Sequence, residues 1–509
     1  MRDKLLFFDE DCNLLLRRLS PDRIKEDAIK WFEFLYSTNI DAVNYTALTN
    51  ELSWIKDITS AEIAGARYRY FDNPELWIQK ENLKILFEKN VDILYLASET
   101  ARKYGKKIFA QVNMCDIRHE EREGILGCEF YCPQVIFDHP EWRIVCGHEG
   151  YKRWLLDFSH QEVRNIRLKI IHELAEKYDV DGIVFSWLGG SRFFPSERQK
   201  ERVPLLTEFL KEVRYTLDKA GKNKGHKLLM IHKISPELDE NTNIGCDITT
   251  WVKKGLADAV QPMDSLYTDF NIRTERYAVL CKDYDCGVYP GVYNMLLGGN
   301  SDYLWHYGMG EMDEEKYRAV TANFLAWGAN GIVLNIRHNW IWNQSRVKDK
   351  VEKAINAISF HKCEKNKIHC YHYQPTWKWD NSGFTMTGRK NAQRLQFRSD
   401  ELGKRQVFKF RMADGRDGEK LRGYLRAQIS EATFEDEFYL DINGIAIPKD
   451  KIKTVSEISD YTVGIGLEID LADCPPFKGD NELGIRWIKK NWNISKDPYM
   501  EILYVYVIE

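Results

Sequence analysis

The sequence has no apolar run long enough to cross a membrane and no excess of charge of one sign. Its 73 basic and 77 acidic side chains give a formal net charge of -4, whereas nucleic-acid-binding proteins normally carry a basic excess. The apolar stretch Leu5–Phe8 is too short for the core of a secretory signal. We therefore expect no nucleic-acid partner, no membrane partner and a cytoplasmic location, unless a signal peptide has been removed. The oligomeric state stays open.

The sequence also lacks the short motifs that indicate a cofactor-binding site. It has no phosphate-binding glycine loop, no dinucleotide fingerprint and no hydrolase nucleophile elbow. The 11 cysteines show no disulfide framework and are expected to be reduced and mostly buried. His and Cys residues gather at 361–372, 128–132 and 146–148, but their spacing fits no zinc pattern. We expect neither a metal nor a cofactor.

Short apolar segments alternate with amphipathic helical segments over the first 360 or so residues. This alternation is typical of repeated βαβ units with a parallel sheet. Eight such segments occur, the number of strands that closes a (β/α)8 TIM barrel. The expected strands are Leu5–Glu10, Asp41–Ala47, Ile108–Met114, Asp181–Trp187, Lys227–Ile234, Asp258–Met263, Cys286–Val292 and Gly331–Arg337.

The pattern changes near residue 360, where the helical period ends. Short alternating runs follow at Gln406–Met412, Leu421–Ile429, Glu437–Ile442, Tyr461–Ile469 and Met500–Val507. Turn signals such as Asp414-Gly415 and Asn443-Gly444 separate them. This pattern predicts an all-β sandwich. We therefore expect a barrel over 1–360, a linker over 361–378 and an accessory β-sandwich over 379–509. The sandwich is expected to brace the barrel, although glycan binding by it is an alternative.

In a TIM barrel, ligands bind at the C-terminal ends of the strands. The side chains expected there mix carboxylates, amides, cations and aromatic rings, which suits a polyhydroxylated ligand because polar groups bind hydroxyls while rings stack on sugar faces. The expected substrate-binding residues are Asp9, Glu10, Asn44, Asn113, His119, Trp187, His232, Lys233, Gln261, Tyr293, Asn335, Arg337, His338 and Trp340.

Two carboxylates are the candidates for catalysis. Asp116 follows the third strand near Asn113 and His119, and it is either a general acid or nucleophile, or a cap in the loop. Asp264 directly follows the sixth strand. His232 and Lys233 are adjacent on one strand, so only one of them can face the barrel mouth while the strand continues. Arg337 and His338 are also adjacent, so the same limit applies to them.

Several segments of the first 360 residues together resemble one known group of proteins. They are Tyr104–Met114, Asp138–Trp142, Leu156–Arg164, Glu173–Ile183, Gly245–Val252 and Gly328–Ile332, with Tyr178-Asp-Val-Asp-Gly-Ile183 the most specific. The chain resembles the glycoside-hydrolase-like TIM-barrel proteins of the family 10 glycosyl-hydrolase-like set. This resemblance implies a barrel that acts on carbohydrate.

The fourth strand departs from this resemblance. Relatives tend to continue from Gly-Ile into Glu-Leu-Asp, whereas this chain has Val184, Phe185 and Ser186 there, followed by Trp187. Glycoside hydrolysis normally uses two carboxyl groups that flank the bond. A glycoside hydrolase with Asp116 and Asp264 as the acid/base pair is thus the first hypothesis. The alternatives are a non-catalytic carbohydrate-binding barrel and an elimination reaction with His232 or Lys233 as the base.

Overall fold

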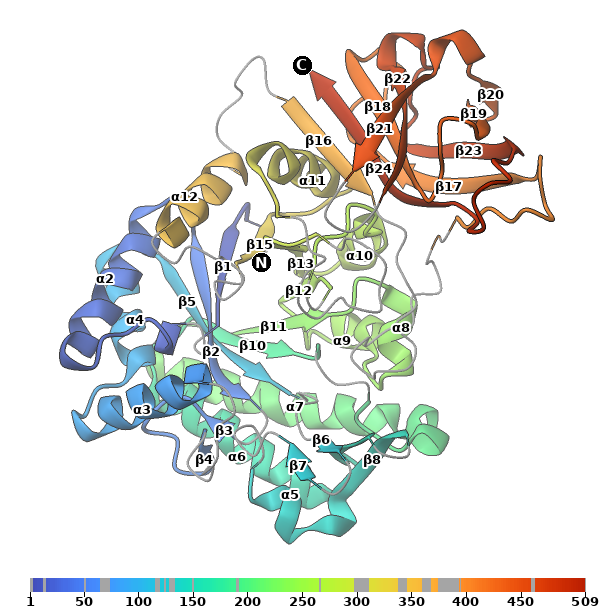
Figure 1. Cartoon of the computed structure of the whole chain (residues 1–509). Helices are drawn as coiled ribbons and strands as arrows, with labels where there is room; N and C mark the ends of the chain where they lie inside the picture. Colours follow the sequence, from blue (N-terminus) through green and yellow to red (C-terminus); the bar gives the residue numbers. More distant parts are fainter. Residues whose placement is uncertain are drawn as a thin grey trace.

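The computed structural model describes most of the chain. Its described residues are 3–11, 15–49, 52–64, 74–114, 120–122, 125–127, 133–148, 151–188, 192–264, 267–296, 311–336, 346–358, 368–373, 393, 395–458 and 463–508. Figure 1 shows a ring of helices around a curled parallel sheet, with a separate all-β part at the C-terminal end. In the described part of the chain, no helix is both long and apolar enough to cross a membrane.

The parallel sheet has the order β13-β12-β11-β10-β5-β2-β1-β15-β14. All eight expected strands are present. The strands are β1 (Leu6–Glu10), β2 (Ala42–Thr49), β5 (Lys107–Asn113), β10 (Gly182–Ser186), β11 (Leu229–Ile234), β12 (Ala259–Pro262), β13 (Gly287–Val288), β14 (Gly291–Tyr293) and β15 (Ile332–Asn335).

The seventh barrel strand is split into β13 and β14 by Tyr289 and Pro290. The first piece pairs with β12 and the second with β15. Across the break, Tyr289 N donates to the Val260 carbonyl (2.9 Å), and Val333 N donates to the Pro290 carbonyl (3.0 Å). Because Pro290 has no N–H to donate, the regular ladder stops there, yet the sheet still closes into a barrel. The predicted (β/α)8 barrel is thereby confirmed.

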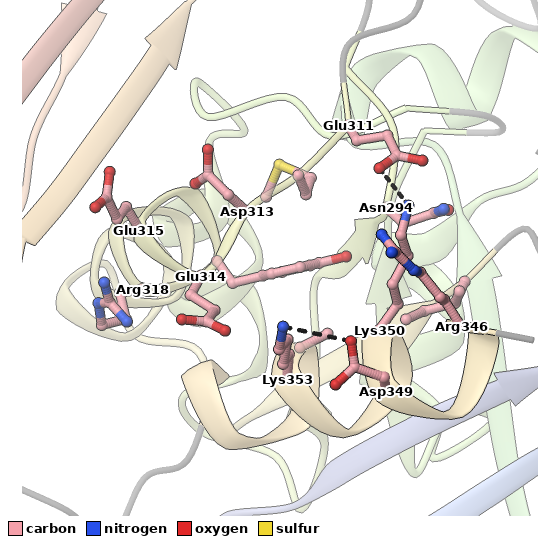
Figure 2. A pocket seen from close by; sticks show the side chains of 14 residues that line it. Asn294, Glu311, Asp313, Glu314, Glu315, Arg318, Arg346, Asp349, Lys350 and Lys353 are labelled. Atoms are coloured by element: carbon pink, nitrogen blue, oxygen red, sulfur yellow. Dashed lines mark hydrogen bonds and ion pairs between the residues drawn. The ribbon is translucent and has the colours of Figure 1, made fainter. Parts of the chain in front are cut away.

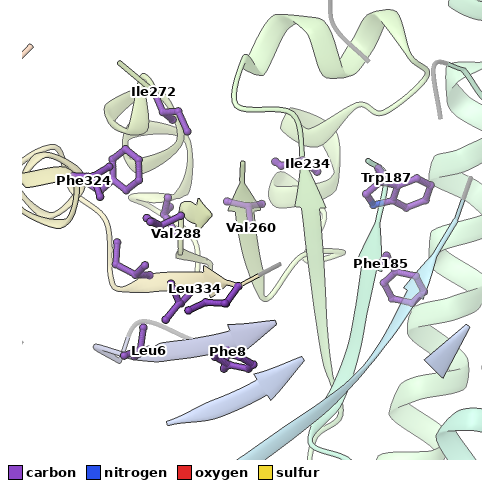
Figure 3. Packing of buried hydrophobic residues seen from close by; sticks show 14 of the residues in the cluster. Leu6, Phe8, Phe185, Trp187, Ile234, Val260, Ile272, Val288, Phe324 and Leu334 are labelled. Carbon is purple, nitrogen blue, oxygen red and sulfur yellow. The ribbon is translucent and has the colours of Figure 1, made fainter. Parts of the chain in front are cut away.

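Helices follow the barrel strands and cover the outside of the sheet (Figure 1). They are α2 (Ile24–Ser37), α3 (Pro74–Glu88), α4 (Ile93–Lys103), α6 (Gln161–Lys177), α7 (Gln199–Lys224), α8 (Leu238–Asn243), α9 (Ile248–Lys253), α10 (Thr274–Cys281), α11 (Glu314–Ala326) and α12 (Val347–Ile358). Outward-facing strand residues such as Phe8, Phe185, Val260 and Leu334 pack against these helices (Figure 3).

Additional strands extend the loops on the C-terminal side of β2 and β5. After β2, β3 (Leu52–Ser53) pairs with β2 and with β4 (Glu62–Ile63). After β5, an antiparallel sheet has the order β7-β6-β9-β8. Its elements are β6 (Glu120–Arg122), β7 (Ile125–Gly127), α5 (Val135–Asp138), β8 (Arg143–His148) and β9 (Tyr151–Leu156).

The C-terminal part is a β-sandwich, as expected. One sheet has the order β16-β24-β18-β22-β21 and the other β17-β23-β19-β20. The strands are β16 (Ile368–Tyr373), β17 (Arg405–Arg411), β18 (Gly423–Ser430), β19 (Glu437–Ile442), β20 (Ile445–Ala446), β21 (Lys453–Ile458), β22 (Val463–Asp470), β23 (Asp480–Lys489) and β24 (Tyr499–Ile508).

Residues 368–373, which the sequence assigned to a linker, form the edge strand β16 of the five-stranded sheet. This strand pairs with β24 and lies against α11 of the barrel. Tyr371 and Tyr373 alternate with Cys370 and His372, and all four are buried. The segment lacks a helical period because it is a strand. The domain boundaries themselves remain a proposal.

Arg411 on β17 joins the sandwich to the barrel. Its guanidinium donates to Glu275 Oε2 on α10 (2.6 Å) and to Asp480 Oδ1 on β23 (2.9 Å). The Cζ atom lies 4.0 Å from the centroid of the Trp327 ring, just after α11. The Arg411 carbonyl accepts a hydrogen bond from Asn323 Nδ2 (2.8 Å). The Arg411 side chain is only 3% exposed, whereas those of Glu275 and Asp480 are 26% and 59% exposed, so a buried cation joins two partly exposed carboxylates at the junction.

Candidate functional site

The barrel interior changes from apolar to polar along its axis. The apolar layer consists of Leu5, Phe7, Ala42, Phe109, Val184, Ile231, Ala259, Tyr289 and Val333. Successive side chains of a strand alternate between its faces, so residues two positions further also face the interior, nearer the C-terminal mouth. These residues, which we call the polar layer, are Asp9, Asn44, Gln111, Ser186, Lys233, Gln261 and Asn335.

An ion pair lies at the centre of the polar layer. Lys233 Nζ contacts Asp9 Oδ2, and both side chains are 4% exposed. The other polar contacts of Asp9 come from amides: Asn44 Nδ2 donates to Oδ1 (2.9 Å) and Asn335 Nδ2 donates to Oδ2 (3.0 Å). Lys233 Nζ also donates to Gln111 Oε1. These partners compensate the desolvation of two charges in the middle of the barrel.

The Asp9 carboxylate also fixes how the neighbouring amides are oriented. An ionised carboxylate only accepts hydrogen bonds, so Asn44 must present its Nδ2 group to it. The same Nδ2 donates to Gln261 Oε1 (3.2 Å). Asn44 Oδ1 and Gln261 Nε2 are then buried without a hydrogen-bond partner among the described residues. One acceptor and one donor therefore remain for a hydroxyl group or a water molecule.

The mouth above the polar layer has two different sides. Toward β2 and β5, Gln111 Nε2 donates to Thr46 Oγ1 (3.1 Å) and to Asn113 Oδ1 (3.2 Å). Above β10, β12 and β14, a small apolar cluster follows. It consists of Leu188, Met263 and Tyr293. The mouth is therefore bordered by amides and a hydroxyl on one side and by buried apolar side chains on the other.

Trp187 and His232 do not lie in the mouth, contrary to our expectation. Both side chains are fully buried on the outer side of their strands, packed against Trp251. Trp187 Nε1 donates to His232 Nδ1 (3.0 Å), which leaves His232 Nε2 to donate to the Leu256 carbonyl (2.7 Å). Burial lowers the pKa of His232 to about 4. Strand alternation gives the inward positions to Ser186 and Lys233 instead.

Glu10 also faces away from the barrel axis. Trp31 Nε1 on α2 donates to its Oε2 atom (2.6 Å), while Oε1 is buried without a partner. Burial is the main cause that raises the pKa of Glu10 to about 8, although the hydrogen bond from Trp31 opposes it. The carboxyl is therefore protonated at neutral pH, and its place behind the strand separates it from the polar layer.

We expect Glu10→Gln to remove a pH dependence of stability. In the unfolded chain this carboxyl has its ordinary pKa of 4.5, whereas in the folded protein its pKa is about 8, so between these values the folded state holds the extra proton. The free energy of unfolding of the wild type therefore falls as pH rises through this window, by an amount on the order of a few kcal/mol. Thermal unfolding at pH 5, 7 and 9 should show a flatter profile for Glu10→Gln. The variant Glu26→Gln, at an exposed residue of α2, should keep the wild-type slope, and equal slopes for all three proteins would contradict the assignment.

The remaining expected site residues divide into two groups. Asp264 is partly exposed and directly follows Met263 of the apolar cluster, and Asn113, Tyr293 and Asn335 line the mouth. The other group lies outside the described residues and consists of Asp116, His119, Arg337, His338 and Trp340. Gln111 was not among the expected residues. Its spacing of two from Asn113 on the same strand is the signal that would have identified it.

No metal-binding cluster of three or more His, Cys, Asp or Glu side chains occurs within the described ranges. Two histidines of the group at 361–372 lie on β16. His369 Nδ1 lies 2.8 Å from Asp414 Oδ2. The imidazole of His372 is buried without a hydrogen-bond partner. The two side chains point to opposite faces of β16 because an odd number of positions separates them.

A separate cavity of about 450 Å³ lies between α11 and α12. Figure 2 shows its charged lining, in which Glu311 pairs with Lys350 and Asp349 pairs with Lys353. Asn294 and Ile336 line it, and each follows an inward-facing residue by one position. Their side chains therefore point out of the barrel, and the cavity is distinct from the mouth.

No family model matches the chain, and no curated protein matches it. Among solved structures, it is similar to the PgaB (BpsB) glycoside hydrolase domain from Bordetella bronchiseptica, with 12% identity and a TM-score of 0.41 over 71% of this chain and 100% of that one. Alpha-L-fucosidase isoenzyme 2 from Paenibacillus thiaminolyticus is 12% identical, with a TM-score of 0.39 over 70% of this chain and 49% of that one. A glycoside hydrolase family 18 N-acetylglucosaminidase from Paenibacillus barengoltzii is 11% identical, with a TM-score of 0.37 over 70% and 99% of the two chains. The assignment of the barrel follows from its own strand order.

Proposed function

We propose that the mouth of the barrel binds a carbohydrate. The observation that carries this proposal is the polar layer, in which amides, a carboxylate and an ammonium face the axis at the C-terminal end of the strands. Amide groups can both donate to and accept from hydroxyls, and the apolar cluster of Leu188, Met263 and Tyr293 suits the C–H face of a sugar ring. The resemblance drawn from the sequence implies the same class of ligand.

We further propose that the reaction is glycoside hydrolysis with Asp116 and Asp264 as the acid/base pair. Asp264 supports this role by its position, because it is partly exposed at the end of the sixth strand beside the apolar cluster. A general acid must be reachable from the mouth, where the glycosidic oxygen would lie. In contrast, Asp9 is enclosed by Lys233 and two amides, which suits it for positioning the ligand.

The expected result is that Asp264→Asn lowers kcat on a cleaved oligosaccharide by about 100-fold or more, because an amide cannot transfer the proton. Asp116→Asn should behave in the same way. The measurement is release of reducing sugar from an oligosaccharide panel. Asp269→Asn is the matched control from the same loop, since Asp269 accepts a hydrogen bond from the Asn271 backbone (2.9 Å) in a turn. Wild-type turnover by both variants would exclude this acid/base pair.

A non-catalytic carbohydrate-binding barrel is the second candidate. The polar layer favours it, since its carboxylate is neutralised by Lys233 and the fourth strand offers Ser186 in place of an acid. Calorimetric binding of an oligosaccharide that stays intact during long incubation would support this candidate, whereas any turnover would exclude it. Elimination finds no such support, because Lys233 is held by Asp9 and His232 faces away from the mouth.

A further inference from the structure

Two aromatic side chains are unusually exposed at one end of the β-sandwich. Trp492 follows β23 and is 73% exposed, and Phe434 follows β18 and is 65% exposed. Large aromatic residues normally bury most of their surface. Strand β23 starts at Asp480, beside Arg411 at the barrel junction, and ends at Lys489. The aromatic pair therefore lies at the end of β23 that points away from this junction.

Trp492 is exposed but supported from one side. Lys490 Nζ lies 5.4 Å from the Trp492 ring centroid and 5.6 Å from that of Trp487. The Lys490 side chain is only 6% exposed, and its ammonium pairs with Asp497 Oδ1 (2.7 Å). The cation thus occupies one face of the indole. Because Trp492 is 73% exposed, the rest of its surface is accessible, and the face of the ring opposite Lys490 is available for stacking.

The loops that carry the two aromatic residues are tied together by Asp436. Its Oδ1 atom accepts hydrogen bonds from Asn491 N (2.9 Å) and Trp487 Nε1 (3.1 Å). Asn491 Nδ2 also donates to Thr433 Oγ1 (3.1 Å). Phe434 and Trp492 are the next residues in each loop, so the two loops that carry them lie side by side. We call Trp492, its support Lys490 and the neighbouring exposed Phe434 the aromatic platform.

We propose that the aromatic platform binds a neutral polysaccharide chain. This choice of ligand rests in part on the proposed function of the barrel. The local charges also favour it, because Lys490 pairs with Asp497 and Lys496 pairs with Glu431 (2.8 Å), so these two lysines are balanced by acids and offer little attraction to an anionic membrane or nucleic acid. A protein partner fits less well, because protein interfaces typically bury about 800 Å² per partner and a few exposed side chains supply less area than that. A supported ring with exposed polar neighbours suits a sugar, which offers one apolar face and a rim of hydroxyls.

The test is affinity electrophoresis of the full chain in gels that contain hydroxyethylcellulose, a galactomannan or a soluble β-1,3-glucan. At least one of these neutral polysaccharides should retard the wild type. Trp492→Ala should weaken this binding by about fivefold to tenfold, as expected for the loss of one stacking contact. Phe434→Ala should have a smaller effect, and Trp492→Phe should retain part of the affinity. Trp77→Ala is the matched control, because Trp77 is also exposed, at 44%, but lies on α3 of the barrel.

The proposal that the platform binds polysaccharide would be overturned if none of the three polysaccharides retarded the wild type. It would also be overturned if Trp492→Ala were retarded as strongly as the wild type. Trp492-dependent binding to phosphatidylcholine vesicles without retardation by polysaccharide would also overturn it. The barrel is tested independently, since Trp492→Ala should leave binding and turnover of a short oligosaccharide unchanged. If no oligosaccharide is bound at the mouth while Trp492-dependent retardation persists, the proposed function fails and the aromatic platform stands.

Discussion

Lys233→Met should lower the free energy of unfolding by about 3–5 kcal/mol, because it leaves the Asp9 carboxylate buried without its cation. Methionine fills much of the volume of the lysine stem, so the loss reports the missing charge and hydrogen bonds. Gln111 Oε1 loses its donor in the same change. The midpoint of chemical unfolding is the measurement, and carbohydrate binding at the mouth should be lost as the polar layer rearranges.

Two variants show whether this loss belongs to the buried pair. Lys227→Met removes another lysine that contacts an aspartate, Asp258, but the Lys227 side chain is 57% exposed. Its expected cost is below about 1 kcal/mol, because solvent screens the charge. The double change Asp9→Asn with Lys233→Met should recover part of the stability, since it removes the uncompensated charge. If Lys233→Met and Lys227→Met were equally mild, the Asp9–Lys233 pair would not organise the polar layer.

Arg411→Ala should lower stability by about 2–3 kcal/mol and should uncouple the sandwich from the barrel, because it removes the charge-assisted hydrogen bonds of a buried guanidinium. The variant removes one of the two cations that pair with the half-buried Glu275, the other being Arg273 (2.5 Å), and it removes the Arg411 guanidinium from the Trp327 ring. Glu275 lies on α10 and Trp327 follows α11, so the losses fall on the barrel side of the junction. Differential scanning calorimetry should then show two transitions, whereas a single transition is expected for the wild type.

Arg405→Ala is the matched control for this prediction. Arg405 lies on the same strand, β17, and makes a bidentate pair with Asp441 (2.6 and 2.8 Å). Both of these residues belong to the sandwich, and the Arg405 side chain is 28% exposed. We expect a loss of about 1 kcal/mol and a single transition. Two transitions in both variants would mean that the junction does not depend on Arg411.

The strands could be predicted because their patterns are local. Each barrel strand is an apolar run between helical segments, and five runs in the sandwich alternate clearly. Strands β21 and β23 were missed, and in β23 Gly484 and several charged side chains interrupt the alternation. Strand β16 was taken for a linker. The break at Pro290 was also missed, because it matters only once both neighbouring strands, β12 and β15, are in place.

The candidate site was predicted less completely, and adjacent residues show why. Strand alternation in β11 predicts that His232 and Lys233 face opposite sides of the sheet, but it does not predict which of the two faces the barrel interior. That choice is made when β11 pairs with β10 and β12 and the sheet closes around Phe7, Val184 and Ile231. The same closure turns Ser186 inward and Trp187 outward.

The sequence by itself determined the (β/α)8 barrel, the sandwich after it and the presence of polar side chains at the strand ends, because these follow from local periodicity. Only the tertiary structure decided that Lys233 meets Asp9, 224 residues away along the chain, and that Trp187 and His232 brace the outside. Contacts of such separation depend on which face of each strand points inward and on strand register, and both are fixed by the packing of the whole barrel.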